Sequence, residues 1–137
     1  MIDEIRKFIE KCPLFSGNSI KVNYLGDKTV TYSIETVPAN PVVRVYADGG
    51  KLCQVLFVIA SRGLYSQSDK NNTAVTKFYE DFSEWIENQD KEGKYPELPA
   101  HCAAQRLEVL TGQYLYDIGN MDARYQIQCR FTYYKDF

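Results

Sequence analysis

The sequence predicts an α/β fold of the α+β kind: a mostly antiparallel sheet, two helices packed on one of its faces, and a long C-terminal β-hairpin. Three observations predict it. Two segments carry apolar residues at the spacing of amphipathic helices, several others alternate apolar and polar residues as half-buried strands do, and these elements follow in the order helix, strand, hairpin, helix, hairpin. With 137 residues and no internal repeat or linker, residues 1–137 are expected to form a single domain.

The first element is a short amphipathic helix, expected over Ile2 to Cys12, with apolar residues on one side and charged residues on the other. Pro13 should end it, because a proline pushes the residue before it out of the α region. A turn is expected at residues 16–18. From Thr29 to Glu35 apolar and polar residues alternate, which predicts a half-buried strand.

Two β-rich runs follow, Val42 to Tyr46 and Lys51 to Ser61. The four residues between them, Ala47-Asp48-Gly49-Gly50, are typical of a hairpin turn. The stretch from Leu52 to Ala60 is nearly all apolar. It is expected to be a central strand that is covered on both faces for at least part of its length.

A second helix is expected to begin at a cap provided by Asn71 or Asn72 and to run to about Asp90. Gly93 is expected to stop it, since glycine often follows the last residue of a helix. The residues that share its apolar stripe are Val75, Phe78, Phe82, Trp85, Ile86 and Gln89. A stripe of this kind is typical of a helix that packs on a core.

The last third of the chain predicts a long β-hairpin, with one arm from Arg106 to Tyr116 and its tip at Ile118 to Met121. The return arm from Ala123 to Tyr134 shows the clearest alternation in the sequence, with apolar residues on one face. Its other face begins with four polar residues, Arg124, Gln126, Gln128 and Arg130. Antiparallel sheets commonly leave one face in water, and arginines on a large flat surface also suit a subunit interface. Both interpretations stay open, and the four residues are our candidate interface.

The bulk composition excludes several function classes. The formal net charge of −2 argues against general nucleic-acid binding, which needs an excess of lysine and arginine. No apolar run is long enough to span a membrane. The start of the sequence lacks the pattern of a signal peptide, so the protein is expected in the cytoplasm of the cell that makes it.

The sequence predicts neither an enzyme nor a metal or cofactor site. Four scattered cysteines lack Cys-x-x-Cys spacing and are expected to be reduced thiols. His101-Cys102 is the one His–Cys pair, and two neighbours do not make a site that needs three or four converging ligands. The acidic residues of the second helix fit its solvent-exposed side, and no glycine-rich phosphate loop is present.

Short segments spread over nearly the whole chain form an ordered series: Cys12-Pro13-Leu14, Asn23-Tyr24-Leu25, Tyr32-Ser33-Ile34-Glu35 with Pro38, Phe57-Val58-x-Ala60-Ser61-Arg62, Phe82-x-x-Trp85 and Tyr125-Gln126-Ile127-Gln128-Cys129-Arg130-x-Thr132-Tyr133-Tyr134. In order and spacing they resemble a family of small proteins from tailed phages and prophages of Firmicutes, usually labelled minor capsid or tail-component proteins. That family is similar to tail-terminator, or tail-completion, subunits. No single segment is chemically diagnostic.

The resemblance implies a structural subunit of the virion tail that caps the tail tube and contributes to head–tail joining. It implies a ring, six-fold in the particle, so the partners would be further copies of this chain, a tail-tube protein and a head-completion or connector protein. A ring needs a heterologous interface, for which the C-terminal hairpin is one candidate. Residues 63–72 and 91–101 are expected to be loops that contact partners above and below the ring.

Three alternatives remain. The first is a head–tail connector or tail-assembly protein of the same particle. The second is a host-directed adaptor, which predicts a monomer with one exposed apolar patch. The third is a small hydrolase or nucleotide-binding enzyme, which would need a deep pocket with converging polar groups.

Overall fold

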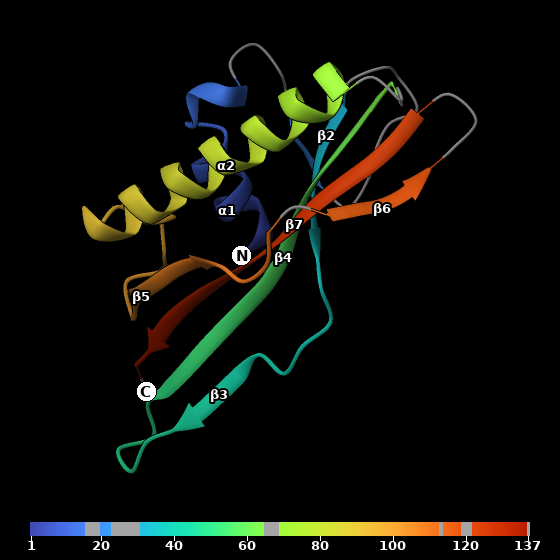
Figure 1. Ribbon diagram of the computed structural model, residues 1–137. Coiled ribbons are helices and arrows are strands. Elements are labelled where there is room, and N and C mark those ends of the chain that lie inside the picture. Colours follow the sequence, from blue (N-terminus) through green and yellow to red (C-terminus); the bar gives the residue numbers. More distant parts are fainter. Residues whose placement is uncertain (16–19, 23–30, 65–68, 113, 119–121, 137) are drawn as a thin grey trace.

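The computed structural model describes residues 1–15, 20–22, 31–64, 69–112, 114–118 and 122–136 (Figure 1). In chain order the elements are α1 (Ile2–Ile9), a 3-10 helix (Pro13–Phe15), β1 (Ile20–Val22), β2 (Thr31–Thr36), β3 (Val42–Val45), β4 (Lys51–Leu64), α2 (Asp69–Lys91), β5 (Cys102–Val109), β6 (Tyr114–Ile118) and β7 (Asp122–Lys135). The predicted α+β class, with two helices and a mostly antiparallel sheet, is confirmed. The turn expected at residues 16–18 lies outside the described residues.

The sheet is built around two long central strands. β4 and β7 each have 14 residues and pair antiparallel along their whole length, from Lys51 opposite Lys135 to Leu64 opposite Asp122. On the outer side of β4 lie β3 and β2, and on the outer side of β7 lie β5 and β6. β1, a strand that the sequence pattern does not predict, pairs parallel with β2. The other described pairings are antiparallel.

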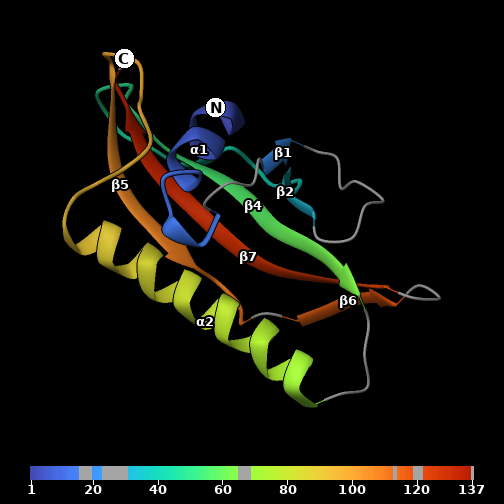
Figure 2. The ribbon, with the colours of Figure 1, turned by 90° about the horizontal axis from the view of Figure 1, so that it is seen from above.

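Both helices pack on the same face of the sheet (Figure 1), so their apolar stripes meet the apolar residues of that face. Seen from above, α2 runs along the side of β5, and α1 lies beside β1 and β2 (Figure 2). The rings of Phe8 and Trp85 join the two helices at a centroid distance of 5.4 Å. The buried core consists of Ile5, Phe8, Ile9, Cys12, Phe15, Ile34, Phe57, Ile59, Tyr79, Phe82, Ile86, Leu107, Ile127, Cys129 and Phe131. The predicted stripe of α2 is thereby confirmed at Phe82 and Ile86.

Helix α1 is shorter than the sequence predicts, since it ends at Ile9. After the helix the chain winds more tightly. The backbone N–H of Cys12 donates to the carbonyl of Ile9 at 2.9 Å, and that of Phe15 donates to the carbonyl of Cys12 at 3.1 Å. These three-residue bonds are those of 3-10 turns. Pro13 disfavours the α conformation at the residue before it, and the tighter winding places Cys12 and Phe15 in the core.

The predicted hairpin between β3 and β4 is confirmed. Gly49 has a φ of 91°, a left-handed conformation that favours glycine, and the N–H of Tyr46 donates to the carbonyl of Gly50 at 2.8 Å to close the turn. Asp48 Oδ1 accepts a further bond from the N–H of Gly50 at 2.9 Å. β4 is also the central strand expected, with residues 57–60 all buried, and it continues to Leu64.

Helix α2 begins at Asp69, before the two asparagines expected to cap it. The loop expected over residues 63–72 is therefore wrong at both ends, and residues 65–68 lie outside the described residues. The stop at Gly93 is confirmed: its φ is 71°, and the N–H of Lys94 donates to the carbonyl of Gln89 at 2.9 Å. The loop expected over residues 91–101 is confirmed for residues 92–101.

The first arm of the C-terminal hairpin is not one strand, as predicted, but two. β5 and β6 both pair with β7, and the chain leaves the ladder between Val109 and Tyr114. There the N–H groups of Leu110 and Thr111 both point to the carbonyl of Gln128, at 2.8 and 3.4 Å, instead of continuing a regular register. Apolar alternation alone does not reveal such a break. The expected tip lies outside the described residues at 119–121.

Replacing Ile127 by alanine should lower the free energy of unfolding by about 2–5 kcal/mol, since its fully buried side chain would leave a cavity under both helices. Urea unfolding monitored by circular dichroism would measure the loss. Val43→Ala serves as a control, because this side chain is 53% exposed and its loss should change the free energy of unfolding by less than about 0.5 kcal/mol. Equal losses would contradict the central place of Ile127.

Candidate functional site

The four residues predicted to form an interface lie in a row along β7. Ile127, Cys129 and Phe131 belong to the core under the helices. Because side chains alternate along a strand, the residues between them lie on the opposite face of the sheet, which we call the open face. Its members on β7 include Arg124, Gln126, Gln128 and Arg130. The structure brings the four together, and their burial and partners decide which of them another protein could contact.

Arg124 and Gln126 belong to a polar cluster within the chain. Arg124 Nη2 forms an ion pair with Glu35 Oε2 at 2.8 Å, and Arg124 Nε and Nη2 donate to Gln126 Oε1 at 3.2 and 3.1 Å. Ser33 Oγ donates to the same oxygen of Glu35 at 2.9 Å. In register, Ala60 of β4 lies between Ser33 of β2 and Gln126 of β7. The cluster therefore bridges β4 where that strand has a small side chain.

Both side chains of this cluster are largely covered. Only 15% of the Arg124 side chain and 6% of Gln126 are exposed. Charge-assisted hydrogen bonds are stronger than neutral ones, so the cluster ties β2 to β7. An interface that used these two residues would have to open it. Of the four predicted interface residues, Gln128 and Arg130 are the more accessible to a partner.

Arg130 belongs to a second charged group, toward β5. Its Nη2 lies 3.2 Å from Glu108 Oε2, and Arg106 Nε approaches the same oxygen at 3.7 Å. The Arg130 side chain is 37% exposed and that of Arg106 is 64% exposed. Glu108 itself is 17% exposed, but ion pairs whose cations reach water contribute about 0–1 kcal/mol each. Two guanidinium groups on one carboxylate leave this part of the open face positive and accessible.

The sequence pattern did not reveal a group of exposed apolar side chains on β3 and directly after it. Among the described residues, Val43 is 53% exposed, Val45 62% and Tyr46 38%, and we call these three the β3 patch. Figure 1 shows β3 far from both helices, at the end of the sheet where β4 begins. A run of valines predicts a strand but not whether anything covers it. The short length of the run, between Pro41 and the turn at Asp48, is the one signal of an exposed edge.

A groove lies beside this strand, where the chain passes from β2 to β3 along the edge of β4. It has a volume of about 320 Å³ and is lined by Met1, Ile2, Thr36, Val37, Ala39, Pro41, Gln54, Val55 and Leu56. We call it the α1–β3 groove. Its lining is mainly apolar, with Thr36 and Gln54 as polar members. The N–H of Val37 donates to the carbonyl of Leu56, and that of Gln54 to the carbonyl of Pro41, each at 2.9 Å, so backbone bonds fix both ends of the groove.

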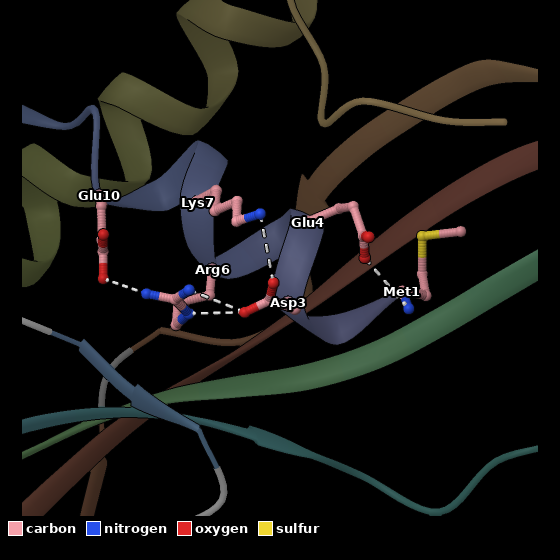
Figure 3. A network of polar contacts seen from close by, with 6 residues as sticks. All are labelled: Met1, Asp3, Glu4, Arg6, Lys7 and Glu10. Atoms are coloured by element: carbon pink, nitrogen blue, oxygen red, sulfur yellow. Dashed lines mark hydrogen bonds and ion pairs between the residues drawn. The ribbon is translucent and has the colours of Figure 1, made fainter.

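The start of α1, which forms one wall of this groove, is ordered by polar contacts on its outer side (Figure 3). The Met1 ammonium lies 3.2 Å from Glu4 Oε2, and Arg6 links Asp3 at 2.7 Å to Glu10 at 2.9 Å. The hydrogen bond from Arg6 holds the pKa of the Asp3 carboxyl below its usual value. Such pairs three and four residues apart support a short helix, so the wall of the groove has a defined position.

The side chains that could take part in catalysis or bind a metal ion are mostly buried or lie apart from one another. Burial raises the pKa of the Cys129 thiol and that of the Cys12 thiol, which keeps both protonated and unreactive. His101 is exposed beside a half-buried Cys102, and the described residues contain no cluster of three metal-ligating side chains. The Tyr79 hydroxyl lies 2.6 Å from Ser61 Oγ and donates to the carbonyl of Tyr125 at 3.1 Å, which ties α2 to the sheet.

Comparison of the chain with protein-family models and with curated proteins gave no match. Within the described residues, no helix is both long enough and apolar enough to cross a membrane.

Replacing Arg124 by glutamine should lower the free energy of unfolding by about 1–3 kcal/mol, because it leaves the partly buried Glu35 without its charged partner. Arg130→Gln is the matched control and should cost less than about 1 kcal/mol, since the Arg130 side chain is 37% exposed and Arg106 stays beside Glu108 after the replacement. Chemical denaturation of both variants would give the comparison. A larger loss for the Arg130 variant would contradict the assignment of the polar cluster. A test of the interface by charge reversal should therefore use Arg130 alone.

The thiols should differ in reactivity. At pH 8 a disulfide reagent such as dithionitrobenzoate should modify Cys102 in the folded protein, whereas Cys12 and Cys129 should react only after unfolding. The reason is that burial hides both thiols and raises their pKa, so the reactive thiolate is rare. Mass spectrometry of peptides from native and denatured samples would identify the modified residues. Rapid modification of Cys129 in the native state would contradict the packing of β7 against the helices.

Proposed function

We propose that this protein is a structural subunit of a tailed-phage or prophage virion, which assembles into a ring, caps the tail tube and contributes to head–tail joining. The observation that carries the proposal is the β3 patch, three neighbouring apolar side chains exposed at the end of the sheet. Large apolar side chains that stay exposed close together are typical of a region that another protein covers. The resemblance of the sequence to tail-terminator subunits indicates which kind of assembly this is.

The partners in this proposal come from the resemblance, and the geometry of a ring leaves surfaces on which they could bind. A closed ring needs two different surfaces on every subunit, one for each neighbour, and the accessible charged part of the open face then remains for a further partner. A tail-tube protein and a head-completion or connector protein would contact such remaining surfaces. The protein would be made in the bacterial cytoplasm and end in the virion tail. A connector or tail-assembly role in the same particle would use the same surfaces.

A second candidate function is favoured by the same patch. A host-directed adaptor that binds one bacterial protein would also expose an apolar patch, and among the described residues the β3 patch is the candidate for it. The two functions differ in what covers the patch: a further copy of the chain in a ring, or a different protein in an adaptor complex. The mass of the protein in solution separates them.

Light scattering across a wide concentration series should show the mass rising from 15.8 kDa for one chain toward about 95 kDa for six. Dilution should reverse the rise, because the proposed ring is held by non-covalent contacts. A chain that stays at 15.8 kDa at all concentrations, with or without added tail tubes, would contradict the ring and favour the adaptor.

A further inference from the structure

We propose that the open face of the sheet binds an acidic segment of a partner protein at the end near β3, through the guanidinium groups of Arg44, Arg106 and Arg130. We call these three residues the arginine group. Both helices lie on the other face of the sheet (Figure 1), so neither covers it. The inference rests on the proposed function, which leaves this face free for a further partner, and it names the chemistry of that partner.

Three neighbouring rows of the open face carry one arginine each. Arg44 lies on β3 opposite Leu52 of β4, and Arg106 lies on β5 opposite Thr132 of β7. Arg130 lies on β7 itself, two residues before Thr132. The arginine group therefore lies on three sides of a centre without charge. The open-face residues of β4 and β7 that form this centre are Leu52, Gln54, Leu56, Thr132 and Tyr134.

The charges in this part of the open face do not balance. Among the described open-face residues of these rows, Glu108 is the one carboxylate, and its Oε2 lies 3.2 Å from Arg130 Nη2 and 3.7 Å from Arg106 Nε. Arg44 is exposed, and none of the described ion pairs includes it. Three guanidinium groups therefore face a single carboxylate that is only 17% exposed. A partner that brings carboxylates would neutralise this excess of positive charge.

The arginine group keeps hydrogen-bond donors free for a partner. A guanidinium has five N–H donors in a planar fork. The described contacts of Arg130 use Nε, at 3.3 Å from Glu108 Oε2, and Nη2, whereas those of Arg106 use Nε. The two outer nitrogens of Arg106, whose side chain is 64% exposed, can therefore pair with a further carboxylate. Glu108 thus positions two of the arginines and does not saturate them.

The features of the centre favour a protein segment over a nucleic acid as the partner. Arginine binds carboxylate and phosphate alike, so the uncharged side chains decide between them. Leu52 and Leu56 are half-buried and suit aliphatic side chains of a partner. The ring of Tyr134, on which a base would stack, already packs against that of Tyr46 at 5.8 Å, and tyrosine and arginine are enriched in protein–protein interfaces. The net charge of −2 also disfavours a long polyanion.

The probe for this site is a fluorescein-labelled peptide of four Glu-Leu repeats, and fluorescence anisotropy measures its affinity for the folded protein. The peptide should bind at low ionic strength and more weakly at about 0.3 M salt, because salt screens exposed charges. A peptide of four Gln-Leu repeats has the same length and aliphatic side chains but no side-chain carboxylate. It should bind at least about tenfold more weakly, since it cannot accept charge-assisted hydrogen bonds.

Arg44→Gln and Arg106→Gln should each weaken binding of the acidic peptide by about three- to tenfold, because each removes one charged partner from an exposed site. Lys94→Gln is the matched control: its side chain is 63% exposed, close to the 64% of Arg106, and it lies in the loop after α2. It removes the same charge and should change the affinity by less than about twofold. Arg106→Lys keeps the charge but loses the planar fork, so it should bind more weakly than the wild type. Circular dichroism of each variant establishes that it is folded.

The outcomes separate this site from the ring. Acidic-peptide binding that is absent, or that Lys94→Gln weakens as much as Arg106→Gln does, overturns the site. A single-stranded oligonucleotide of equal charge that binds more tightly than the peptide, through the same arginines, also overturns it. Light scattering without the peptide tests the ring independently. A ring that forms without binding the peptide leaves the proposed function intact, whereas a chain that binds the peptide but keeps the mass of one copy supports the site and overturns the ring.

Discussion

Every layer of this protein depends on the antiparallel ladder between β4 and β7. Because the two strands pair over 14 residues each, one face presents an unbroken apolar strip, from Val55 opposite Phe131 to Ile59 opposite Ile127, on which both helices pack. The other face of the same ladder carries the polar cluster of Arg124 and the ion pairs of Arg130. At one end the ladder extends beyond both helices, and there β3 adds to the sheet with neither α1 nor α2 above it (Figure 1).

The parts of the fold that follow from local periodicity could be predicted from the sequence. The alternation along β7 correctly placed Ile127, Cys129 and Phe131 in the core, and the stripe of α2 correctly placed Phe82 and Ile86. β1 could not be predicted, since three residues are too few to show a period. The break between β5 and β6 depends on how Leu110 and Thr111 meet Gln128, a contact between residues distant in sequence.

In the candidate site, too, local periodicity predicts some features, while contacts between residues distant in sequence decide the others. Alternation placed Arg124 and Gln126 on the open face, but their burial depends on Glu35, which lies 89 residues before Arg124 in the chain. The exposure of Val43 and Val45 depends on whether another element covers them. The residue types that predict a strand do not show whether it is covered. The two ends of the sheet consequently differ in character. Near Arg124 the polar side chains are covered and bonded to one another, while apolar side chains stay exposed at the β3 end.

The place of β7 in the sheet has a consequence for how the chain folds as the ribosome releases it. Of the two central strands β4 is made first, and α2, β5 and β6 are all made before its second long neighbour, β7. Until β7 follows, β4 is an apolar strand with an open edge, and closing the long loop between the two carries an entropic cost. The central ladder is therefore a late event of synthesis, and the interval before it is the period in which a nascent chain of this protein is most prone to aggregate.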